Sequence, residues 1–171
     1  MITKSRRRGL GRAVALGGAL MLGGCAGEGG FDSVFSVNPI AEGDLPQVRA
    51  RGDASRVVVY GGDPAGAAAA IALPQELGGG GFAAAPPEAR GSRLALAFGS
   101  AAPNAMCEGT AAVAPSDPPT ATLTWCIGDR PVAAATLRGP ALAGPQADGF
   151  GPAVKTGLAT MLRPEPPRSG R

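Results

Sequence analysis

The chain has 171 residues, enough for one domain of ordinary size with additional tails. Its formal net charge is +3, but five of its 16 basic residues, and none of its 13 acidic residues, precede Cys25. Residues 25–171 therefore carry 11 basic and 13 acidic side chains, a net charge of −2. Because no basic patch interleaved with aromatic residues remains there, we expect no nucleic-acid partner.

The composition from Cys25 onward predicts a small core. Only 27 of these 147 residues are Leu, Ile, Val or Phe, whereas the whole chain has 28 Gly and 17 Pro. Such a chain lies near the compositional border with disorder, although its low net charge argues for folding. We expect a β-rich core set among long loops.

Residues 1–24 have the order of a secretory signal peptide. The basic start M-I-T-K-S-R-R-R-G-L-G-R is followed by the apolar run A-V-A-L-G-G-A-L-M-L-G-G. This run of 12 residues is shorter than the roughly 20 that a membrane-spanning helix needs. We therefore predict a cleaved leader. The stretch S-R-R-R-G-L partly matches the twin-arginine export motif, so the sequence leaves the export route open.

Leu22-Gly23-Gly24-Cys25 resembles the lipobox of bacterial lipoproteins. In that family the cysteine thiol receives diacylglycerol, and signal peptidase II then cuts in front of it. The resemblance implies that Leu22, Gly23 and Gly24 are recognised by the peptidase. It also implies that Cys25 carries diacylglycerol and an N-linked acyl chain such as palmitate, which together anchor the protein stably in a membrane.

The residue after the cysteine bears on localisation. Ala26 stands where an aspartate commonly signals retention in the inner membrane. In a host with two membranes we therefore expect an outer-membrane lipoprotein that faces the periplasm.

Residues 25–54 are expected to form a flexible tether. Charged residues, Gly and Pro recur there, and no helical or strand period is sustained. A tether of about 28 residues would hold a domain roughly 25–30 Å from the lipid on average. Phe31, Val34 and Phe35 are expected to pack on the domain, with packing on a partner as the alternative.

A folded domain is expected over residues 55–163. R-V-V-V-Y at 56–60 is typical of a buried strand. The segment 65–73 fits a short helix or a strand, and its alanines favour the helix. Residues 74–91, with four consecutive glycines, are expected to be a loop. They lack the Gly-Lys-Ser/Thr of a phosphate-binding loop.

The strongest strand patterns lie in the second half of this domain. R-L-A-L-A-F at 93–98 alternates and predicts a strand with one buried face, formed by Leu94, Leu96 and Phe98. A-T-L-T-W-C-I at 121–127 alternates too, and Gly128-Asp129-Arg130 connects it to 131–138 in a predicted hairpin.

A helix is predicted over residues 151–163. Its apolar face, which consists of Val154, Leu158, Met161 and Leu162, is expected to dock on the sheet. Residues 164–171 are expected to be a disordered tail.

Cys107 and Cys126 are the two thiols that remain once Cys25 is lipidated. An even pair in an exported protein predicts a disulfide, with free thiols as the alternative. It would join the loop after residue 98 to the first strand of the hairpin. Structural zinc needs four ligands and the chain has no histidine, so we predict neither a metal nor a cofactor.

The lack of histidine also removes the usual general base for a serine or cysteine nucleophile. We therefore predict no catalytic residues and no enzyme activity. Trp125, the lone tryptophan, is expected in the core, with a role as a ligand platform as the alternative.

The predicted fold class is mainly β, a small antiparallel sheet with one C-terminal helix, with an α+β arrangement also possible. Residues 93–138, with W-C-I-G-D-R, are similar to domains of small lipoproteins from high-GC Gram-negative bacteria, a resemblance that implies no activity. The predicted function is that of a lipid-anchored, non-catalytic accessory module with an envelope protein as partner. The alternative is binding of a lipid, sugar or peptide in a pocket near Trp125.

Overall fold

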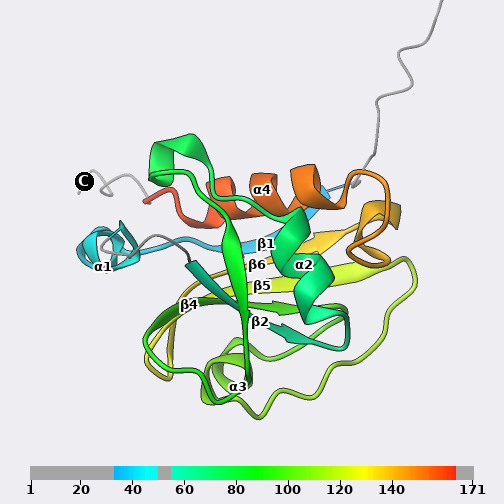
Figure 1. Ribbon diagram of the computed structural model, residues 1–171, viewed down its shortest axis with the longest axis horizontal. Helices are drawn as coiled ribbons and strands as arrows, with labels where there is room; N and C mark the ends of the chain where they lie inside the picture. The colour runs from blue at the N-terminus through cyan, green and yellow to red at the C-terminus, as the bar shows by residue number, and fades with distance from the viewer. Residues whose placement is uncertain (1–32, 50–54, 165–171) are drawn as a thin grey trace, which may run out of the picture.

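A six-stranded sheet with the strand order β1-β6-β5-β4-β2-β3 organises the protein (Figure 1). The computed structural model describes residues 33–49 and 55–164. The strands are β1 (Ser33–Asn38), β2 (Ser55–Tyr60), β3 (Phe82–Ala85), β4 (Ser92–Ala97), β5 (Thr120–Ile127) and β6 (Arg130–Arg138). The helices are α1 (Leu45–Arg49), α2 (Pro64–Ala70), α3 (Pro103–Glu108) and α4 (Phe150–Met161). Single 3-10 turns are η1 (Glu42–Asp44), η2 (Gln75–Leu77) and η3 (Pro140–Leu142).

The predicted fold class, mainly β with α+β character, is confirmed. The hairpin of β5 and β6 forms as expected, and it pairs antiparallel with β4 and β1 on either side. The sheet as a whole is mixed, because β2 pairs in parallel with both β3 and β4. No helix among the described residues is long and apolar enough to cross a membrane.

The parallel pairs depend on crossover connections. α2 follows β2 directly, and the Asp63 carboxylate caps it by accepting the Ala65 N–H at 3.0 Å. The preference of the alanines for a helix is thus confirmed. The sequence does not predict β3. The glycines of residues 74–91 indicate a loop, and an alanine-rich segment has a weak strand preference.

Both faces of the sheet are covered. On the first, the α2/α4 face, the helices α2 and α4 pack over a large core that includes Val57, Leu94 and Trp125. On the second, the α3 face, α3 and neighbouring loops cover a smaller cluster of Val58, Tyr60, Ala95, Ala97, Met106, Cys107 and Cys126. Figure 1 shows α4 and α3 on opposite sides of the sheet. The expectation that the strand at 93–98 buries one face is therefore wrong.

α4 lies close against the sheet. The predicted inward residues Val154, Leu158, Met161 and Leu162 are all 0–1% exposed, which confirms docking on the sheet. The close approach depends on Gly157, where an added Cβ would lie 2.7 Å from Leu123 Cδ1 and 3.0 Å from Leu137 Cδ1.

The tether predicted over 25–54 is corrected for residues 33–49, which belong to the domain. β1 pairs with β6 from Ser33 to Asn38, and the Ile40 N–H donates to the Met161 carbonyl at the end of α4 at 2.9 Å. Ile40 and Val48 are 1% and 0% exposed. Residues 25–32 and 50–54, like the tail at 165–171, lie outside the described part of the chain.

The sequence does not predict β1, because a bulge lies between Val34 and Ser36. Val34 pairs with Leu137 and Val37 with Ala135, so both valines face the α2/α4 side although three positions separate them. An extra residue in a bulge breaks the two-residue period by which strands are recognised.

Replacing Gly157 with valine should destabilise the domain by about 1–3 kcal/mol, because the side chain would overpack the space between α4 and two buried leucines. Urea unfolding of the purified domain measures this change. The matched control is Thr156→Val on the exposed side of the same helix, which should leave stability nearly unchanged. Equal stability of the two variants would contradict the close packing.

Asp44 and Arg130 join η1 to the hairpin, with oxygen–nitrogen distances of 2.7 and 3.2 Å. The hydrogen bond from Arg130, aided by its charge, lowers the pKa of Asp44 below its ordinary value. The contribution of the Asp44–Arg130 ion pair to stability is therefore present above the unfolded-state pKa of Asp44 and is lost as pH falls through its folded-state pKa. The melting temperature of Asp44→Asn should thus fall less on acidification than that of the wild type. Parallel curves would refute this.

Candidate functional site

The most densely bonded polar group on the α3 face is the side chain of Arg93, on β4. Its guanidinium donates to the carbonyls of Gly128 at 2.7 Å, Gly91 at 3.2 Å and Cys107. These acceptors belong to the β5–β6 turn, the β3–β4 loop and the last turn of α3. The residue is 0% exposed, so one cation holds three segments together in the interior.

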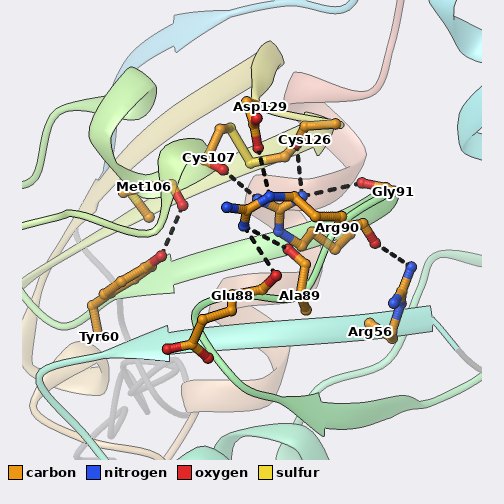
Figure 2. Close-up of polar contacts among 12 residues, drawn as sticks. Arg56, Tyr60, Glu88, Ala89, Arg90, Gly91, Met106, Cys107, Cys126 and Asp129 are labelled. Carbon is orange, nitrogen blue, oxygen red and sulfur yellow. Dashed lines mark hydrogen bonds and ion pairs between the residues drawn. A yellow bond between two sulfur atoms is a disulfide. The ribbon is translucent and has the colours of Figure 1, made fainter.

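The charge of Arg93 is balanced by dipoles rather than by a carboxylate in direct contact. Burial, followed by repulsion from Arg90, lowers the pKa of Arg93, but an arginine keeps its proton at neutral pH. The Cys107 carbonyl lies at the carboxyl end of α3, where backbone carbonyls favour a cation. Asp129 binds Arg90 instead, at 3.1 Å on the surface (Figure 2).

The predicted disulfide is confirmed. Cys107 on α3 and Cys126 on β5 are joined beside the Arg93 side chain, with a Cα–Cα distance of 5.5 Å. Both residues are 0% exposed, so solvent reductants have no direct access to the sulfurs. Cys107 lies in a helix and not, as expected, in a loop.

Tyr60 adds a further tie between β2 and α3. Its hydroxyl donates to the Met106 carbonyl at 2.8 Å, as Figure 2 shows. Burial raises the pKa of this hydroxyl. The buried Thr122 hydroxyl similarly donates to the Gly99 carbonyl at 2.9 Å. These polar groups hold backbone segments in place.

Trp125 occupies the core, as the first of its two expected roles requires. The indole is 0% exposed, its Nε1–H donates to the Ser92 hydroxyl at 3.0 Å, and its ring meets Phe82 edge-on at 6.4 Å. The indole therefore has no solvent-accessible surface in this structure.

Cavities open to solvent lie elsewhere on the described residues, and two of them are well defined. One, of about 260 Å³, lies beyond the carboxyl ends of β2 and β4 and is lined by Gly61, Phe98, Thr120 and neighbouring residues. Its hydroxyls at Ser116 and Thr120 bond to each other at 2.6 Å. The other, of about 200 Å³, lies between η2 and the end of α4. Neither is lined by a buried charged side chain.

Among the described residues there is no group of three or more His, Cys, Asp or Glu side chains that could hold a metal ion. Leu22, Gly23, Gly24 and Cys25, the residues of the predicted lipidation site, lie outside the described ranges.

The largest exposed apolar side chain in residues 33–49 and 55–164 is Phe35 on β1, at 63%, followed by Val37 at 38%. The expected packing on the domain is right for Val34, which contacts the core, and wrong for Phe35. Instead the guanidinium of Arg138 lies 4.7 Å from the centre of the Phe35 ring. The exposed position of Phe35 has no signal in the sequence, because the bulge interrupts the alternation of β1.

No protein-family model, no curated protein and no solved structure shows a significant match to this chain.

Arg93→Met should destabilise the domain by about 3 kcal/mol, because it leaves the buried Cys107 carbonyl without the guanidinium donor and removes the bonds to the Gly91 and Gly128 carbonyls. Denaturant unfolding measures the loss, and Arg56→Met is the matched control. Arg56 is an exposed arginine whose side chain, among the described residues, donates to the Arg90 carbonyl, so its replacement should cost no more than about 0.5 kcal/mol.

Arg93→Met should lower the free energy of unfolding by a smaller amount in a Cys107→Ala, Cys126→Ala background, where α3 is no longer tied to β5. A disulfide that closes a loop of this length contributes about 3 kcal/mol in the chain-entropy model. An equal effect of Arg93→Met in both backgrounds would show that the cation and the disulfide act independently.

Proposed function

We propose that this protein is a lipid-anchored cell-envelope protein whose disulfide-bonded domain is a non-catalytic accessory module. The observation that carries the proposal is the leader, in which a basic start and a short apolar run end at Leu22-Gly23-Gly24-Cys25. The diacylglycerol and acyl chains implied at Cys25 would attach the protein to a membrane. Ala26 favours the outer membrane.

The cysteine usage supports export. Cys107 and Cys126 form a buried disulfide, and stable disulfides of this kind belong to oxidising compartments such as the periplasm. Pairing of these two leaves Cys25 as the one cysteine of the sequence outside the bond.

The buried polar groups of the α3 face support a non-catalytic role. Arg93, Tyr60 and Thr122 each donate hydrogen bonds to backbone carbonyls of α3 or of the connecting loops. A rigid domain stapled in this way suits a protein that presents a fixed surface to an envelope partner.

On this proposal, β1 shortens the tether between the lipid and the domain from the predicted 25–54 to the residues before Ser33. Ser33, the first residue of β1, is eight residues after Cys25. A chain of this length reaches at most about 28 Å when fully extended. As a flexible coil it would span about 16 Å on average.

Cys25→Ser should release the protein from membranes and abolish palmitate incorporation in the native host. The measurement is the membrane fraction of tagged protein after ultracentrifugation, with intact mass to detect the acyl chains. Ala26→Asp is the matched control, which should keep the lipid but move the protein from the outer to the inner membrane. Unchanged labelling and sedimentation of Cys25→Ser would refute the anchor.

A further inference from the structure

The edge strand β1 carries an unusual surface. It is the first strand in the sheet order, so one of its edges has no strand partner among the described residues. Its sequence, S-V-F-S-V-N, has no charged residue and no proline. Phe35 and Val37, the exposed large apolar side chains of residues 33–49 and 55–164, both belong to it.

The bulge between Val34 and Ser36 accounts for the outward position of Phe35. A bulge re-aims a side chain and interrupts the regular ladder of backbone hydrogen bonds. Such an interruption is one of the ways in which proteins prevent an edge strand from pairing with another chain. The edge is therefore poorly suited to a second copy of this protein.

Arg138 gives this surface a positive charge. Its guanidinium stacks on Phe35 at 4.7 Å, and no described carboxylate forms an ion pair with it. Its Nε is buried without a hydrogen-bond partner. An aromatic ring beside a cation that lacks an anion matches the lipid–water interface, where the ring meets acyl chains and the guanidinium meets phosphate oxygens.

The length of the chain between the anchor and β1 identifies the occupant. On the proposed function, Cys25 is in the membrane and only the seven residues 26–32 separate it from Ser33. β1 is thus the described strand that the anchor holds nearest along the chain. We propose that β1 lies against the lipid surface, with the Phe35 ring at the headgroup end of the acyl chains and Arg138 bound to lipid phosphate.

Phe35→Trp tests this contact in the full, lipidated protein reconstituted into vesicles of phosphatidylethanolamine and phosphatidylglycerol. Compared with the same protein in the absence of vesicles, the emission of the new tryptophan should shift to shorter wavelength. It should also be quenched by phospholipids that are brominated near the headgroup end of their acyl chains. The wild type supplies the background of Trp125, which is 0% exposed and should not respond to these lipids. Unchanged melting temperatures show that the variants fold.

The matched control is Ala83→Trp. Ala83 is exposed on β3, at the opposite edge of the sheet, and its replacement should be quenched no more than the wild type. Arg138→Gln in the Phe35→Trp protein should reduce the quenching, because a bond to phosphate is lost.

The outcomes separate this inference from the anchor itself. A lipidated Phe35→Trp protein that sediments with vesicles but shows no bromolipid quenching overturns the contact and leaves the anchor intact. A shift to shorter wavelength without quenching by bromolipid indicates a protein partner, such as a second copy, and also overturns it. A protein that lacks acyl chains and does not sediment overturns both.

Discussion

The guanidinium of Arg93 holds together the parts of the chain that would otherwise have little reason to meet. Transfer of a cation into the interior costs several kcal/mol, which the domain offsets with charge-assisted bonds to three carbonyls and the carboxyl end of α3. The neighbouring disulfide fixes the same helix covalently. Together they hold α3 on the α3 face, where the apolar cluster is the smaller of the two in the domain.

Local patterns were sufficient to predict β2, the β5–β6 hairpin, α4 and the disulfide. β2 is a short apolar run, the hairpin and α4 have a regular period, and the disulfide follows from an even pair of cysteines in a chain with an export signal. β1 and β3 have no such signal, because a bulge breaks the period of the first and alanine has little preference for the strand conformation of the second.

Arg93 shows what a one-sided reading of a strand misses. An arginine opposite a row of leucines is normally a solvent-facing residue, and its burial depends on α3, a short helix with weak sequence signals. A hint was nevertheless present. Ala95 and Ala97 follow it on the same face, and such small apolar side chains permit a close neighbour where an exposed strand usually carries polar ones.

The pairing of β1 with β6 has a mechanical consequence. In the proposed anchored state, any pull between membrane and domain enters the fold at Ser33, which pairs with Arg138, and passes along the strand to Asn38, which pairs with Ala134. The Ile40 N–H bond to α4 and the Asp44–Arg130 ion pair stand behind that strand as further attachments. In that state, β1 is the strand through which force between the membrane and the domain is transmitted.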